Sequence, residues 1–174
     1  MSDFDAEFGG SIEEEMREIR GALLNDQIAV LSPAEPIRLA TTATVDEAIH
    51  RMLVQRQPGV MIVAPNGRLV GIFTERDVVT RVLGQRLDPR RTQLGAVMTP
   101  NPEALRTADR VAYAVHCMSV AGYRTVPLVD GEQRPIGVVT VSDVIRWLAN
   151  LFPEAVLNLP PGGKIKHPDE VDGA

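Results

Sequence analysis

The sequence predicts an α+β protein made of two β-α-β-β-α repeats that pack against each other, preceded by an amphipathic helix. Three observations support this fold class. The 174 residues are 44% hydrophobic, enough to bury a core in one domain or two small modules. Residues 31–84 align without a gap with residues 97–150. Within each copy, helix-like apolar spacing alternates with short β-rich runs.

The duplication is visible in two matching heptapeptides. GIFTERD at 71–77 and GVVTVSD at 137–143 share a Gly, a Thr and an Asp at the same places, offset by 66 residues. The same offset pairs Pro36 with Pro102, Thr41 with Thr107, Val45 with Val111, Ala48 with Ala114, His50 with His116, Met52 with Met118 and Val63 with Val129. A gapless match of this length indicates an internal repeat.

Each copy is expected to begin with a short extended segment, at 37–40 and around Leu105, followed by a helix. In the first copy, Thr44 and Glu47 form a capping box at the start of that helix. Apolar residues then recur at helical spacing on one face. They are Val45, Ala48, Ile49, Met52 and Leu53 in the first copy and Val111, Ala114, Val115 and Met118 in the second.

Two strands and a second helix complete each copy. The strands are expected at 60–63 and 68–73, joined by a Pro-Asn-Gly turn, and at 126–129 and 135–139, joined by an Asp-Gly turn. A copy of about 54 residues is too small to bury the apolar faces of two helices and a sheet alone, so the copies should pack together.

The chain therefore divides into five parts: an N-terminal segment with its helix (1–30), the first copy (31–84), a linker (85–96), the second copy (97–151) and a tail (152–174). Ile12, Met16, Ile19 and Leu23 form the apolar stripe of the N-terminal helix over 11–30. This stripe should pack on the repeats or on a second subunit. The Pro- and Gly-rich tail is predicted to be disordered.

The paired Thr and Asp residues, Thr74 with Asp77 and Thr140 with Asp143, have two interpretations. A Thr followed three residues later by an acid is typical of a capping box. The same helix start also offers N–H groups to a phosphate, and a carboxylate can accept hydrogen bonds from ribose hydroxyls. The Gly at the start of each heptapeptide would let a flat base approach the backbone. Capping and nucleotide binding do not exclude each other.

The duplicated plan resembles a tandem pair of cystathionine-β-synthase (CBS) domains, known as a Bateman module. The motifs VMTPNP (97–102) and YRTVPLVD (123–130) and the two G-h-h-T-x-x-D segments, where h is apolar, share this resemblance, which covers 31 to about 151. In that family, the Thr and Asp contact the ribose and phosphate of adenosine ligands. The resemblance implies the same roles for Thr74, Asp77, Thr140 and Asp143. It also implies base slots walled near Thr41 and Val60 in one cleft and near Thr107 and Val126 in the other.

Arg124 occupies a position where family members often have a basic residue that reaches phosphates. Its counterpart in the first copy is Pro58, so the two clefts should be unequal. The cleft that lacks Arg124 would take positive charge from Arg76, Arg81 or the linker arginines. Which cleft Arg124 faces stays open at this stage, and a solvated surface arginine is the alternative.

We therefore expect a regulatory module that binds AMP, ADP or ATP and changes the arrangement of its homodimer or of an unknown protein target. The alternatives are a constitutive dimerisation module with degenerate clefts and an S-adenosylmethionine binder. An enzyme is not expected, because the sequence has no nucleophile-base set, metal cluster or P-loop, and its flanks are short. Cys117, the single cysteine, is expected to be a buried thiol.

Composition limits the partners. The net charge is −5 and only 4% of residues are aromatic, which argues against binding of nucleic acid. No apolar run reaches the roughly 20 residues of a membrane span, and the acidic start is unlike a secretory signal. The expectation is a cytoplasmic protein with no membrane partner and no required cofactor.

Overall fold

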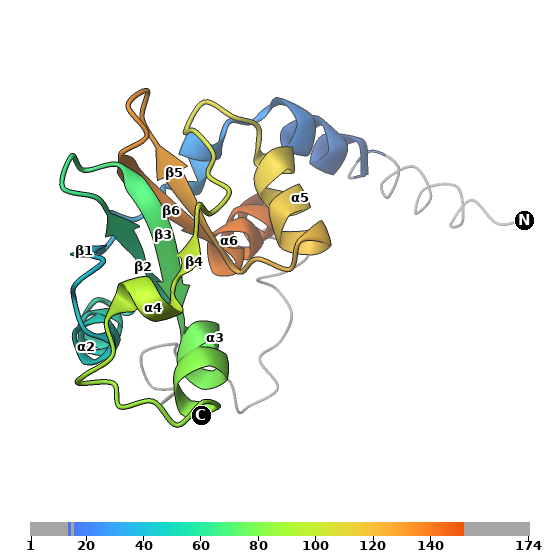
Figure 1. Ribbon diagram of the computed structural model, residues 1–174. Coiled ribbons are helices and arrows are strands. Elements are labelled where there is room, and N and C mark those ends of the chain that lie inside the picture. Colours follow the sequence, from blue (N-terminus) through green and yellow to red (C-terminus); the bar gives the residue numbers. More distant parts are fainter. Residues whose placement is uncertain (1–13, 15, 152–174) are drawn as a thin grey trace, which may run out of the picture.

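The computed structural model describes residue 14 and residues 16–151, and Figure 1 shows their arrangement. The predicted tail (152–174) and the first residues of the predicted N-terminal helix lie outside the described residues. The first copy contains β1 (Arg38–Ala40), α2 (Val45–Gln55), β2 (Gly59–Val63), β3 (Leu69–Thr74), α3 (Glu75–Asp77) and the π-helix η2 (Val78–Leu83). The second contains α5 (Val111–Val120), β5 (Thr125–Val129), β6 (Pro135–Thr140) and α6 (Val141–Leu151). The 3-10 helix η1 (Ile28–Leu31) leads into the first copy, and α4 (Leu94–Val97) leads into the second, which begins with β4 (Thr99–Pro100).

The sheet topology confirms the predicted α+β class. In the first copy, β1 runs parallel to β2, and β3 pairs antiparallel with both β2 and β4. In the second copy, β5 and β6 form an antiparallel hairpin. A parallel bridge between Leu105 and Leu128 stands where the first copy has the β1–β2 pairing. The first strand of the second copy is thus reduced to a single bridge.

The segment that leads into the first helix of each copy pairs with the other copy. β4 belongs in sequence to the second copy but is the edge strand of the first sheet, against β3. Reciprocally, Ala34 precedes β1 but bridges Val138 of β6. The hydrogen bond from the Ala29 N–H to the Thr107 carbonyl (3.0 Å) repeats, at the 66-residue offset, as one from the Gly95 N–H to the Thr41 carbonyl (2.9 Å). Each fold is therefore completed by residues that belong, in sequence, to the other.

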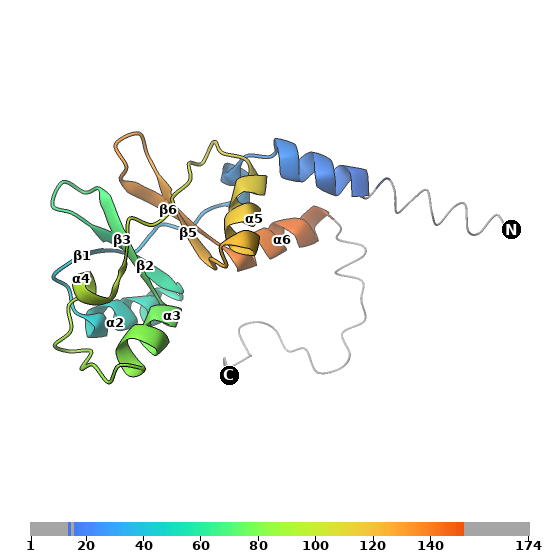
Figure 2. The same cartoon turned by 45° about the vertical axis from the view of Figure 1, so that its right-hand side comes forward.

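Each copy has its own hydrophobic core, and the two sheets meet between them. Successive side chains of a strand point to opposite faces, so Val60, Ile62 and Phe73 fill the first core whereas Met61 and Ile72 point away from it. The latter two contact Val138 of β6. Figure 2 shows the outcome: α2 and α3 lie at one end of the molecule, α5 and α6 at the other, and the two hairpins lie between them.

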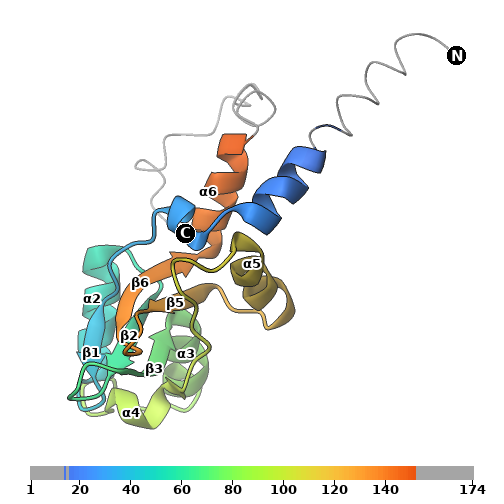
Figure 3. The same cartoon turned by 90° about the horizontal axis from the view of Figure 1, so that it is seen from above.

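The N-terminal helix packs on the second copy. Residues 16–25 are helical, and Figure 3 shows them on the side of α5 and α6. Ala22 and Leu23 contact the second core, which also contains Ile28 and Leu31 of η1. Met16 of the predicted apolar stripe is 62% exposed. Among the described helices, none has both the length and the apolar character to cross a membrane.

Candidate functional site

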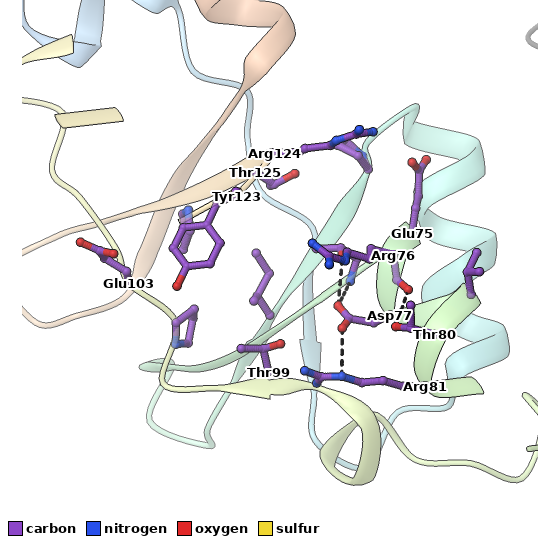
Figure 4. A pocket seen from close by; sticks show the side chains of 17 residues that line it. Glu75, Arg76, Asp77, Thr80, Arg81, Thr99, Glu103, Tyr123, Arg124 and Thr125 are labelled. Carbon is purple, nitrogen blue, oxygen red and sulfur yellow. Dashed lines mark hydrogen bonds and ion pairs between the residues drawn. The ribbon is translucent and has the colours of Figure 1, made fainter. Parts of the chain in front are cut away.

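A cavity of about 740 Å³ opens between the two copies. Figure 4 shows its lining side chains, which come from the start of the α3–η2 helix, from the segment after β4 and from the segment that leads into β5. Three arginines and three acids line it: Arg76, Arg81, Arg124, Glu75, Asp77 and Glu103. Its other side chains include Ile72, Thr74, Thr99 and Tyr123. Both copies contribute charged side chains to it.

Thr74 and Asp77 form the predicted capping box at one wall of the cavity. β3 ends at Thr74 in an extended conformation, and the helix begins at the next residue. Asp77 Oδ2 accepts hydrogen bonds from the Thr74 N–H (2.9 Å) and from the Thr74 hydroxyl (2.8 Å). The capping interpretation is confirmed for this pair, and it fixes the orientation of a side chain that is only 10% exposed.

A guanidinium compensates the charge of that carboxylate. Arg81 Nε lies 3.2 Å from Asp77 Oδ1, and Arg81 also donates to the Val97 carbonyl at 3.0 Å. A carboxylate offers about four acceptor positions, and the protein uses three of them here. Asp77 therefore retains acceptor capacity on Oδ1, next to the cavity, for one donor from a bound molecule.

The second copy repeats this geometry away from the cavity. Asp143 Oδ2 accepts from the Thr140 N–H and the Thr140 hydroxyl, both at 2.8 Å. Arg146 lies 3.1 Å from Asp143 Oδ1, and its side chain is 68% exposed against 39% for Arg81. The Asp143 carboxylate is thus the less shielded of the two.

Arg124 faces the cavity of the first copy. Its carbonyl accepts from the N–H of Val141 at the start of α6 (3.1 Å), as the Pro58 carbonyl accepts from Glu75 at the start of α3 (3.1 Å). The two carbonyls have equivalent roles, but only position 124 has a cationic side chain, and that side chain lines the cavity that contains Asp77. No hydrogen bond or ion pair holds the guanidinium groups of Arg76 and Arg124 within the described residues.

Only part of the predicted site lies in this cavity. Of the ten residues predicted to bind the ligand, the cavity brings together Thr74, Asp77, Arg76 and Arg124. Val60 (0% exposed) and Val126 (1%) are buried, and the carbonyls of Thr41 and Thr107 accept the exchanged hydrogen bonds between copies. Six predicted residues therefore lie outside this cavity: Thr41, Val60, Thr107, Val126, Thr140 and Asp143.

The glycine of the first heptapeptide does not open the backbone to the cavity, contrary to our expectation. A Cβ at Gly71 would lie 2.3 Å from Met98 Sδ. The position needs glycine because the Met98 side chain covers the backbone there.

Sequence reasoning missed Thr99, Glu103 and Tyr123 as lining residues. All three lie in or beside the motifs VMTPNP and YRTVPLVD, so the motifs were recognised but the direction in which these side chains point was not.

Burial, followed by the charge of Glu103, raises the pKa of the Cys117 thiol above its ordinary value. Within the described residues, no three His, Cys, Asp or Glu side chains form a metal-binding group.

The structure defines a duplicated α+β module with a cavity between its copies to which both contribute charged side chains. The model of the CBS domain matches residues 29–84 and 94–150, so the chain belongs to the CBS domain family. It is 36% identical over 110 residues to the Meiotically up-regulated gene 70 protein of Schizosaccharomyces pombe, covering 63% of this chain and 15% of that protein. It is 26% identical over 120 residues to the CBS domain-containing protein CBSCBSPB3 of Arabidopsis thaliana, covering 69% of this chain and 20% of that one. The matched region is thus a small part of these relatives.

Solved structures of CBS domain pairs share the fold. The pair of protein MJ0100, in complex with 5′-methylthioadenosine and S-adenosyl-L-methionine, has a TM-score of 0.65 and 25% identity, covering 72% of this chain and 97% of that one. The CBS domain protein PAE2072 from Pyrobaculum aerophilum, complexed with AMP, has a TM-score of 0.64 and 25% identity, covering 76% and 95%.

Proposed function

We propose that this chain is a regulatory module that binds a phosphorylated adenosine ligand, AMP, ADP or ATP, in the cavity between its copies. One observation carries the proposal: Arg76 of the first copy and Arg124 of the second face the same cavity as the capped carboxylate of Asp77. Guanidinium groups bind phosphate through charge-assisted hydrogen bonds. The free acceptor on Asp77 Oδ1 would take a ribose hydroxyl.

Such a ligand would act by shifting a conformational equilibrium. It would contact Asp77 and Arg76 from one copy and Arg124 from the other, so its affinity depends on how the copies are placed. A ligand with a higher affinity for one arrangement increases the population of that arrangement. No reaction is part of this proposal.

The response would reach a second subunit or a protein target. Apolar side chains are exposed on helices of both copies, among them Leu53 of α2 (73% exposed), Val120 of α5 (72%) and Ile145 of α6 (60%). Their exposure supports a homodimer as part of the proposal. A cytoplasmic location is also proposed, since AMP, ADP and ATP are available there.

S-adenosylmethionine is the second candidate ligand, because the related domain pair of MJ0100 was solved with it. It has the same adenine and ribose but no phosphate. In that case Asp77 would bind the ligand while Arg76 and Arg124 would add nothing to its affinity.

The test is a binding and thermal-melt screen of ligand-free protein with AMP, ADP, ATP, GTP and S-adenosylmethionine. A ligand at 100 times its Kd stabilises one site by about 2.7 kcal/mol, a rise of roughly 5–11 °C for a protein of this size. We expect adenine nucleotides to give this rise. Asp77→Ala should remove it and Arg124→Ala should reduce it by about half, whereas Asp143→Ala should not change it. A flat response to all five ligands would favour the constitutive dimerisation module.

A further inference from the structure

The charged side chains of the cavity are distributed unevenly. Figure 4 shows Arg76, Asp77 and Arg81 on one side of the pocket and Glu103 and Tyr123 on the opposite side. One side therefore has the cations suited to phosphates and a capped carboxylate suited to ribose. The other has an aromatic ring and an acid, with no arginine beside them in this view.

Glu103 and Tyr123 both lie near one buried residue of the second copy. Cys117 of α5 is 2% exposed, and its carbonyl accepts from the Tyr123 N–H at 3.4 Å. The Cys117 thiol lies beside the Glu103 carboxylate, which contributes to raising the pKa of that thiol through its charge and a hydrogen bond. A thiol that stays protonated can donate to a carboxylate.

The groups of a nucleotide follow the same order as the side chains of the cavity. If its phosphates lie at Arg76 and Arg124 and its ribose at Asp77, its base extends toward Tyr123 and Glu103. Tyrosine presents an aromatic face on which a planar base can stack, and Tyr123 is 42% exposed, so its ring is accessible. An ionised glutamate accepts hydrogen bonds and donates none.

We infer that Glu103 and Tyr123 form the base-recognition end of this cavity and that Glu103 selects a base with an exocyclic amino group at the edge it meets. This inference rests on the proposed function, because it assumes that a nucleotide occupies the cavity.

The selection follows from donor and acceptor chemistry. The amino group at position 6 of adenine donates hydrogen bonds, which a carboxylate accepts. Hypoxanthine has a carbonyl oxygen at the same position, so an acceptor would face the Glu103 carboxylate there and the hydrogen bond from the 6-amino group would be lost. A hydrogen bond to a charged group contributes more than a neutral one, and a site built around such a bond rejects the analogue that lacks it.

The experiment compares the affinities of AMP and IMP, which differ at this edge of the base, by calorimetric titration of the full chain. The parent should bind AMP roughly 10- to 100-fold more tightly than IMP. In Glu103→Gln the amide can donate as well as accept, so the two affinities should come within about threefold. Glu103→Ala should also lose the preference. Glu132→Gln, in the β5–β6 turn outside this cavity, removes the same charge and should keep it.

The possible results distinguish failure of the inference from failure of the proposed function. If AMP binds in an Asp77-dependent manner but the AMP-to-IMP ratio is the same in Glu103→Gln as in the parent, Glu103 does not read the base and the inference is overturned. Equal affinities of the parent for AMP and IMP overturn it as well. If the parent binds neither nucleotide, the proposed function fails and the inference fails with it. Melting temperatures of the ligand-free variants establish that each is folded.

Discussion

The two capped carboxylates allow a matched test of how burial affects the contribution of a charge to stability. Asp77→Ala and Asp143→Ala each remove an acceptor of two hydrogen bonds from a Thr at a helix start. Loss of a cap costs about 1 kcal/mol, and the bond from the hydroxyl adds about 1 kcal/mol. Each variant should therefore lose about 2 kcal/mol from this source.

The ion pairs distinguish the two variants. Asp77 and Arg81 have side chains 10% and 39% exposed, whereas Asp143 and Arg146 are 17% and 68% exposed. Solvent screens the second pair more, so it should contribute almost nothing, and the first no more than about 1 kcal/mol. We expect a total loss of about 3 kcal/mol for Asp77→Ala and about 2 kcal/mol for Asp143→Ala.

Urea unfolding of nucleotide-free protein, followed by circular dichroism, measures both losses. Glu35→Ala is the control, because it removes only an exposed ion pair with Arg38 and should cost under about 0.5 kcal/mol. A double-mutant cycle of Asp77 and Arg81 isolates the pair itself. If Asp143→Ala destabilises the protein as much as Asp77→Ala, shielding of the guanidinium does not determine the difference and the reasoning is wrong.

Three further predictions concern other parts of the module. Arg124→Ala should lower the affinity for AMP about tenfold and leave that for S-adenosylmethionine unchanged in titration, because only AMP has a phosphate; equal losses would exclude a phosphate contact. The raised pKa of Cys117 means that the folded protein keeps this proton longer than the unfolded chain. The stability that the protonated thiol contributes is therefore complete below the pKa of the unfolded chain, about 8.5, and is lost as pH rises through the pKa of the folded protein. The free energy of unfolding should fall across that pH range, and less so in Cys117→Ala. Gly71→Ala should cost about 1–3 kcal/mol in urea unfolding by displacing Met98, and Met98→Ala should reduce that additional cost; a neutral Gly71→Ala would show that Met98 moves freely.

The order of strands and helices could be predicted because the repeat presents each local pattern twice. The N-cap at Thr44 is an example: its hydroxyl accepts from the Glu47 N–H at 3.2 Å, as the spacing indicates. The helix after β3 was predicted only as a helix. The structure resolves it into three α-helical residues and a π-helix over Val78–Leu83, a difference that apolar spacing does not report.

The site was predictable only in part, because its walls come from different copies. The local motif indicates that Asp77 is capped, and the bonds from Thr74 confirm it. Whether Arg124 faces its own copy's Asp or the other's depends on how the sheets pack through Met61, Ile72 and Val138. Spacing along the chain contains no information on that packing. Glu103 and Tyr123 were missed for the same reason.

The exchange of edge segments also bears on how such a module can assemble. A chain ending at residue 84 would lack the edge strand that Thr99 and Pro100 add to β3, and its residue Ala34 would have no partner strand. Two such half-chains could complete each other only by meeting in solution, at whatever concentration the cell provides. In the joined chain each donor segment is tethered to its acceptor, at an effective concentration on the order of millimolar. Joining the copies therefore replaces a bimolecular association with an intramolecular one, so folding of the module does not depend on its abundance.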